Sequence, residues 1–299
     1  MSAGAAVSKV PEYRPKISPG ACRLCGALGQ TSVAVEGNDK RLVRCGNCQV
    51  VFLEPPPNEI DFTAEFEERH ITSDERLEQF FASKRDPVLA FAASQIQRYK
   101  KSGTILDVGC AGGHFLANFF APSDWLKFGV EPSRFAARRA NENGIETYQG
   151  ELKSVELPAG MFDVITALGV LLYFRDPRRN LAKLRKSLKP GGVLIIELPL
   201  AEAQLWRNSP KLSRFVGKSR SLLASNHLFY YNVASLTYLL RDSGFRVREI
   251  RSVPAMAQPT LRQTILARVY YQVSRTLWAL SGRRIMLGPE FLAVTSAAE

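Results

Sequence analysis

Short apolar runs alternate with amphipathic segments along most of the chain after residue 100. The apolar runs are typical of buried strands, and they cover residues 103–109, 125–131, 145–150, 162–168, 193–199, 245–253 and 291–297. Between them, helical spacing covers residues 114–120, 132–144, 176–192 and 233–245. Strands and helices that alternate in this way form a mainly parallel sheet with helices on both faces. We therefore predict an α/β fold with a seven-stranded sheet.

The first hundred residues have a different pattern and predict smaller units. Residues 1–20 are rich in Pro, Ser and Gly, and Pro55-Pro56-Pro57 interrupts any regular element. Further along, Asp86-Pro87 is typical of a helix N-cap followed by Pro at the first helical position. The predicted units are a flexible leader (1–20), a metal-binding ribbon (21–54), a helical linker or cap (55–100) and the α/β domain (101–299).

Four of the five cysteines form two pairs with the spacing C-x2-C-x19-C-x2-C, at Cys22, Cys25, Cys45 and Cys48. Two residues between thiolates let both sulfurs of a pair reach one ion, and four thiolates complete a closed tetrahedral zinc shell. A catalytic zinc needs an open position, and a redox dithiol needs only one pair. The spacing therefore predicts a structural Zn²⁺, with Cys110 left over, as suits a reducing cytoplasm.

A glycine-rich turn lies between the first strand of the α/β domain and the helix that follows it. Gly109, Gly112 and Gly113 let the backbone approach a ligand closely, and Asp107 lies near the strand end. Glu131 ends the next strand, where a carboxylate accepts hydrogen bonds from the ribose hydroxyls of an adenosine-like ligand. The pattern indicates a nucleotide-type cofactor, and cofactors of several kinds share it.

Four sequence blocks resemble, in order, those of class I S-adenosylmethionine (SAM)-dependent methyltransferases. LDVGCAGG is similar to the first motif of that family, with Ala111 in place of a Gly, and GVEPS is similar to its acidic second motif. FDVITALGVLLYFRDP and LRKSLKPGGVLIIELP resemble the blocks around the fourth and fifth strands. The resemblance covers about residues 100–255 and implies a Rossmann-like sheet, SAM as cofactor and methyl transfer as activity. With its N-terminal ribbon, the chain is similar to bacterial methyltransferases of sugar, cell-envelope and natural-product pathways.

The resemblance also implies which residues hold SAM. Asp107 would lie near the methionine amino group, Glu131 would bind the ribose hydroxyls, and Pro132 and Glu151 would border the adenine. The complete implied set is Asp107, Gly109, Cys110, Ala111, Gly112, Gly113, Glu131, Pro132, Glu151, Leu168 and Gly169. A nicotinamide-dependent dehydrogenase is a weaker alternative, because the fourth and fifth blocks do not suit one.

Two residues are catalytic candidates on the acceptor side of the site. His227 lies near the end of a long segment, predicted as a substrate-side insertion over residues 200–230, and its imidazole suits a general base near neutral pH. Leu172 and Tyr173 stand where many relatives have an acidic residue and a His, so we predict no catalytic metal. In the alternative interpretation, Tyr173 is an aromatic wall and His227 orders its own loop.

The net charge of +12 indicates an anionic partner, and its distribution refines that prediction. Residues 1–100 carry 13 basic and 13 acidic side chains, whereas residues 201–299 carry 14 and 5, a net +9. The excess therefore lies on the presumed acceptor side rather than on the ribbon. We expect a small anionic acceptor, such as a nucleotide-linked sugar or a lipid-linked intermediate. RNA is the second alternative, and a non-catalytic zinc- and SAM-binding partner protein is the third.

Two segments concentrate this charge. Residues 207–220 carry five basic and no acidic side chains, and residues 261–280 suit an amphipathic helix with apolar and arginine-bearing sides. The helix either covers the sheet with its arginines in solvent, or faces an anionic substrate or a membrane surface. No apolar run of about 18 residues occurs, so we expect no spanning helix and a cytoplasmic location, with peripheral membrane contact as an option.

Overall fold

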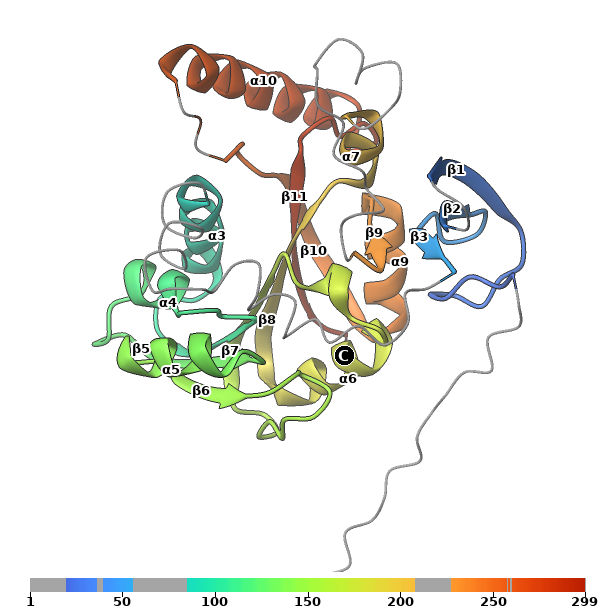
Figure 1. Ribbon diagram of the computed structural model, residues 1–299. Coiled ribbons are helices and arrows are strands. Elements are labelled where there is room, and N and C mark those ends of the chain that lie inside the picture. Colours follow the sequence, from blue (N-terminus) through green and yellow to red (C-terminus); the bar gives the residue numbers. More distant parts are fainter. Residues whose placement is uncertain are drawn as a thin grey trace, which may run out of the picture.

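The computed structural model describes residues 20–36, 40–55, 85–207, 227–256, 258 and 260–298. A seven-stranded sheet forms its centre (Figure 1). In sheet order the strands are β10 (Phe245–Ser252), β11 (Glu290–Ala297), β8 (Leu188–Pro199), β7 (Phe162–Leu168), β4 (Gly103–Val108), β5 (Trp125–Glu131) and β6 (Glu146–Gln149). The five strands from β8 to β6 are parallel, and β11 is antiparallel to both of its neighbours. The predicted seven-stranded α/β fold is confirmed.

Two apolar layers cover the two faces of this sheet, because successive strand residues point to opposite sides. Ile105 packs in a cluster with α3 (Asp86–Tyr99), α4 (His114–Phe119) and α5 (Arg134–Glu142). Its neighbour Leu106 packs in a second cluster with α6 (Pro177–Ser187) and α9 (Val233–Asp242). Since both sides are covered, the central strands are apolar along nearly their whole length.

Two predicted helix boundaries are shifted. Arg85 is the N-cap of α3, and Asp86 is its first helical residue. The Asp86 carboxylate does not cap the helix; it lies 2.8 Å from Nε2 of His114. At its C-terminus, α6 ends at Ser187, and the LKPGG segment predicted as helix belongs to β8.

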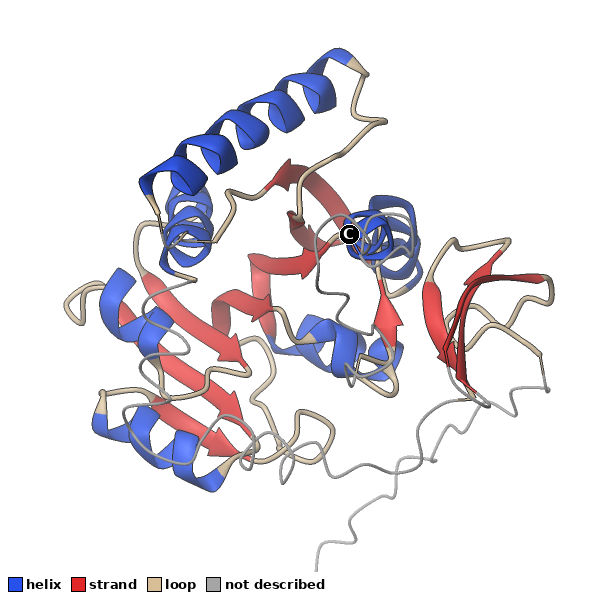
Figure 2. Cartoon of the chain, turned by 45° about the horizontal axis from the view of Figure 1, so that its top comes forward, coloured by secondary structure: helices blue, strands red, loops and turns tan. Residues whose placement is uncertain are grey.

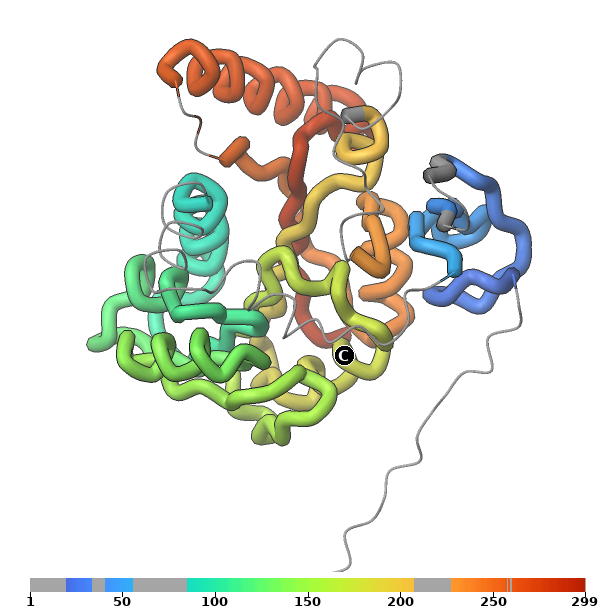
Figure 3. The backbone as a smooth tube through the Cα atoms, in the orientation of Figure 1, coloured from blue at the N-terminus to red at the C-terminus, as the bar shows by residue number. Residues whose placement is uncertain are grey.

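The N-terminal ribbon is continuous with the α/β part of the molecule. β1 (Gln30–Glu36), β2 (Lys40–Cys45) and β3 (Val51–Glu54) form an antiparallel sheet, and β9 (Phe229–Tyr230) extends it from far along the chain. Phe52 of β3 pairs with Phe229 of β9, and both belong to the same apolar cluster as α6 and α9. In Figure 3 the blue ribbon accordingly lies beside the orange segment that contains β9 and α9.

Helix α10 (Leu261–Leu280) follows β10 and lies at the periphery of the molecule in Figures 1 and 2. The predicted helix is confirmed, but the alternative in which its apolar side covers the sheet is wrong. Ser274 and Trp278 are its buried residues, whereas its branched apolar side chains are exposed. A shorter helix, α7 (Ala201–Arg207), follows β8. Residues 1–19, 56–84 and 208–226, which include nearly all of the leader, much of the linker and most of the basic segment 207–220, lie outside the described residues.

Candidate functional site

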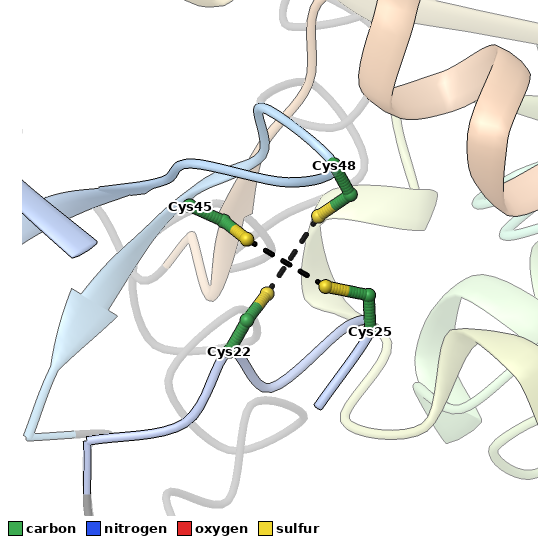
Figure 4. A group of neighbouring side chains, drawn as sticks. All are labelled: Cys22, Cys25, Cys45 and Cys48. Atoms are coloured by element: carbon green, nitrogen blue, oxygen red, sulfur yellow. Dashed lines mark hydrogen bonds between the residues drawn. The ribbon is translucent and has the colours of Figure 1, made fainter. Parts of the chain in front are cut away.

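Two similar turns bring the four cysteines together (Figure 4). Cys22 and Cys25 lie in the loop before β1, whereas Cys45 ends β2 and Cys48 lies in the turn before β3. The Gly26 amide donates to the Cys22 carbonyl (2.8 Å), and the Gln49 amide donates to the Cys45 carbonyl (3.1 Å). Both donors have positive φ angles, which turns each loop back toward its own first cysteine.

The geometry of the cluster suits a single metal ion. All four Sγ atoms lie within 4.8 Å of one another, and the Cys22–Cys48 and Cys25–Cys45 sulfurs are each 3.6 Å apart. Zinc–sulfur bonds of about 2.3 Å place tetrahedral ligands about 3.8 Å apart. The donor set therefore fits Zn²⁺ with no open coordination position. Sequence reasoning missed Tyr231, whose buried hydroxyl has no hydrogen-bond partner among the described residues and adjoins the charges of Cys22 and Cys48.

The turn from β4 to α4 is closely packed at its glycines. A Cβ on Gly109 would lie 2.5 Å from Cγ1 of Val170, and both Gly109 and Gly113 have positive φ angles. Ala111 also adopts a left-handed φ of 48°, a conformation that costs a residue with a side chain about 1 kcal/mol. Cys110 contributes only backbone to the turn, because its side chain is buried in the core against Gly129. Non-glycine strain of this kind is concentrated at ligand sites.

Asp107 and Glu131 lie on neighbouring strands, and both are buried. Asp107 accepts a hydrogen bond from Thr166 Oγ1 (2.6 Å), and burial raises its pKa to about 7 against the opposing effects of Thr166 and Arg85. Glu131 accepts from the amides of Ala111 and Ser133, each at 2.9 Å. These two backbone donors orient both carboxylate oxygens of Glu131 at the end of β5.

The remaining predicted cofactor residues follow the same edge of the sheet. Strand register places the carboxyl ends of β4, β5, β6 and β7 side by side. Pro132 follows β5, Leu168 ends β7 and Gly169 follows β7. The Gly169 amide donates a hydrogen bond to the Glu197 carbonyl (2.9 Å). Glu151, beyond the end of β6, is exposed and forms an ion pair with Lys153 (3.0 Å). The structure therefore gathers the predicted cofactor residues at one edge.

An ion pair that sequence reasoning missed lies at this edge. Arg85 Nη2 and Glu197 Oε2 are 2.5 Å apart, and the Glu197 side chain is 1% exposed. A Cβ on Gly169 would lie 2.9 Å from Arg85 Nη1, so the glycine leaves room for the guanidinium. The overlooked signal is a carboxylate in the otherwise apolar strand VLIIELP.

The structure brings the two acceptor-side candidates together. The His227 and Tyr173 rings meet edge to face with centroids 5.3 Å apart. The Tyr230 ring makes a second edge-to-face contact with His227, with centroids 5.4 Å apart. Tyr173 ends the short 3-10 helix η1 (Leu171–Tyr173), to which the Leu228 amide is bonded through the Leu172 carbonyl (2.9 Å). Burial lowers the His227 pKa to about 4, so its imidazole is neutral at pH 7.

The profile of a family described as "Methyltransferase domain" matches residues 75–250, more than half of the chain. The chain belongs to this family. It is a SAM-dependent methyltransferase, as the resemblance implied, and the alternative of a non-catalytic partner protein is disfavoured. The enzyme carries its glycine turn and acidic strand ends within the matched segment.

Two curated relatives of this methyltransferase are tRNA U34 carboxymethyltransferases. The protein of Hydrogenovibrio crunogenus is 28% identical over 159 residues, which cover 49% of this chain and 45% of the relative. The protein of Klebsiella pneumoniae subsp. pneumoniae is 29% identical over 167 residues, which cover 54% and 48%. The methyltransferase thus spans about half the length of these relatives.

A solved structure shares the fold. A complex of the Haloferax volcanii Trm112 methyltransferase activator with a methyltransferase contains a chain that superposes with a TM-score of 0.55. The match covers 81% of this methyltransferase and the whole of that chain, at 16% identity. At this identity the likeness concerns the fold alone.

Proposed function

We propose that this methyltransferase transfers the methyl group of SAM, or a group derived from it, to a nucleotide of an RNA acceptor. The observation that carries the proposal is its similarity to relatives named for the modification of tRNA. Sequence reasoning ranks a small anionic acceptor first and RNA second; the relatives favour the reverse order. The net charge of +12 suits a phosphate backbone, which basic proteins bind by displacing counterions.

Aromatic and basic groups on the acceptor side support this proposal. Tyr173 is 40% exposed beside His227, and unstacked RNA bases bind to aromatic side chains of this kind. Helix α6 begins four residues further along the chain and carries five basic and no acidic side chains. Its exposed Arg179, in the first turn of the helix, is suited to a phosphate contact, which positions RNA without selecting its sequence.

In this proposal the carboxyl edge of β4, β5 and β7 binds SAM. Asp107 accepts a hydrogen bond from the methionine ammonium group, and Glu131 accepts from the ribose hydroxyls. Arg85, held in place by Glu197, presents a positive charge for the methionine carboxylate. Pro132 and Glu151 border the adenine, and Leu168 and Gly169 line the methionine side.

Catalysis in this proposal depends mainly on alignment. When bound, SAM supplies a sulfonium methyl group for in-line displacement. His227 is neutral, and its Nδ1 is buried with no hydrogen-bond partner among the described residues. This nitrogen accepts a hydrogen bond from an N–H or O–H of the RNA. The bond orients the lone pair of the RNA nucleophile toward the methyl group. Tyr173 holds the acceptor base by stacking. Because the His227 pKa is low, positioning is its larger contribution and proton removal the smaller one.

Labelled SAM tests the acceptor class. The purified enzyme is incubated with it and with either total RNA or a small-molecule extract. Label in the RNA that ribonuclease releases supports the proposal, and label confined to small molecules overturns it. His227→Gln should bind SAM as the parent protein does and transfer label at least about tenfold more slowly. Unchanged turnover in that variant would remove His227 from the mechanism.

We also propose that Cys22, Cys25, Cys45 and Cys48 hold one structural Zn²⁺. The sulfur distances and the closed donor set support it. Metal analysis should find one zinc per chain, and its absence from protein purified without chelators would contradict the proposal.

A further inference from the structure

One side of α10 is an apolar stripe of exposed side chains, of which Tyr270 donates a hydrogen bond to the Leu287 carbonyl after the helix. The stripe consists of Ile265, Leu266, Val269, Tyr270, Val273 and Leu277, whose exposed fractions run from 36% for Leu277 to 58% for Leu266. The spacing of these residues places them on one arc of the helix. Single exposed apolar residues are ordinary, but a continuous row along a 20-residue helix indicates an interaction surface.

The attachment of α10 to the sheet leaves the stripe pointing away. Trp278 Nε1 donates to the Ile250 carbonyl (3.2 Å), and Ser274 Oγ lies 3.3 Å from Ser252 Oγ. These two contacts fix α10 to β10 through residues that lie outside the arc of the stripe. The helix is therefore held firmly while its apolar side stays accessible.

The charges around the stripe are of one sign. Residues 261–288 contain five arginines and no acidic residue. Arg268 lies three residues after Ile265, on the adjoining part of the helix surface, and Arg275 lies seven residues after Arg268 on the same side. Arg283 and Arg284 follow the C-terminal end of the helix. A second copy of the chain docked stripe to stripe would bring these arginines together, which disfavours a homodimer through this face.

We propose that α10 is an interfacial helix that docks the enzyme on an anionic membrane surface. The apolar stripe would enter the boundary between headgroups and acyl chains, and the arginines would bind lipid phosphates. No helix in the described part of the chain is long and apolar enough to cross a membrane, so the contact is peripheral. This inference does not depend on the nature of the methyl acceptor.

Vesicle sedimentation with the full-length protein tests the inference. Vesicles of phosphatidylcholine with about one third phosphatidylglycerol should carry the protein down, and pure phosphatidylcholine should bind it much more weakly, because each arginine near an anionic surface strengthens binding about fivefold. Added salt should weaken the binding to the anionic vesicles. Failure to bind anionic vesicles at low salt would overturn the proposal.

Two double variants and a matched control locate the contact. Val269→Asp with Val273→Asp should lower vesicle binding at least tenfold, and Arg268→Glu with Arg275→Glu should remove the preference for anionic lipid. Leu126→Asp changes a leucine that is 66% exposed on β5, outside α10, and should bind as the parent protein does. All five side chains are exposed, so the circular dichroism spectra should stay unchanged.

Two further outcomes would contradict the membrane assignment. If sedimentation equilibrium shows a dimer that the Val269→Asp and Val273→Asp pair dissociates, the stripe is a contact between copies. If that pair weakens RNA binding and leaves vesicle binding intact, the stripe belongs to the acceptor surface.

Discussion

At the scale of single residues, burial of Asp107 couples SAM binding to pH. The Asp107 pKa is raised to about 7, so the free enzyme loses the negative charge as pH falls below that value. An ammonium group binds best to the ionised form, so the Kd for SAM should rise about tenfold per pH unit below pH 7. Titration calorimetry between about pH 5 and pH 7 measures this rise. Asp107→Asn should bind weakly with a flat profile; a profile as steep as that of the parent would assign the proton to another group.

The same shift predicts a pH effect on stability without cofactor. An unfolded Asp ionises near pH 4, whereas Asp107 in the fold ionises near pH 7. The folded state therefore binds more protons in this interval, and its stability should decline as pH rises from about 4 to about 7. Urea unfolding should show this decline to be smaller in Asp107→Asn, which has no proton to lose. An equal decline in both proteins would contradict this assignment.

The Arg85–Glu197 pair makes a second residue-scale prediction. Removing one member of a buried ion pair leaves an uncompensated charge and costs about 3 kcal/mol or more. Arg85→Ala should lower the free energy of unfolding by about this amount, because the Glu197 side chain is 1% exposed. Arg85→Met combined with Glu197→Leu should recover most of the loss in urea unfolding. A double variant as unstable as Arg85→Ala would show that lost packing, not the unpaired charge, dominates.

The sequence predicts a residue's position when the pattern that indicates it is local, and fails when the residue's partner lies far away in the chain. The positions of Asp107 and Glu131 at the carboxyl edge of the sheet were predictable because each lies at the end of an apolar strand beside a glycine turn or a Pro. The partnership of Arg85 with Glu197 was not, because 112 positions separate the two residues and only the folded sheet brings them together. Tyr231 was missed for the same reason: its neighbours Cys22 and Cys48 lie in the ribbon.

At the scale of elements, the sequence predicted the strands of the central sheet and helix α10 well. It predicted poorly which segments these elements pair with or pack against. The seven strands of the central sheet and helix α10 were all predicted, since their periodicity is local. The two-residue strand β9 was not, because so short a segment has no periodicity of its own and exists only through its pairing with β3. The exposed side of α10 was also beyond local reasoning, since an amphipathic helix reveals its apolar face but not what covers it.

The β3–β9 pairing predicts how zinc removal would propagate. If the four cysteines hold zinc as proposed, loss of the metal removes the tetrahedral anchor of the ribbon, so β2 and β3 should lose order. Because Val51 and Phe52 pair with Tyr230 and Phe229, the segment after His227 should lose protection as well. Hydrogen exchange after treatment with a chelator should be faster in β2, β3 and β9 and unchanged in β4, β5 and β7. Faster exchange throughout the sheet would show that the ribbon and the α/β part unfold as one unit.

At the scale of the whole molecule, two basic surfaces serve two proposed anionic partners, and salt distinguishes their contributions. Arg179 of α6 is exposed on the acceptor side, whereas Arg268 and Arg275 lie on α10. If RNA binds across α6, each phosphate contact adds about one unit to the slope of log affinity against log salt. Arg179→Ala should therefore weaken RNA binding and lower that slope by about one, while vesicle binding stays at the parent value. Arg268→Glu with Arg275→Glu should give the opposite pattern.

Fluorescence anisotropy with labelled RNA, measured at several salt concentrations beside vesicle sedimentation, compares the two kinds of binding. A single surface serving both partners would make each set of variants weaken both kinds of binding.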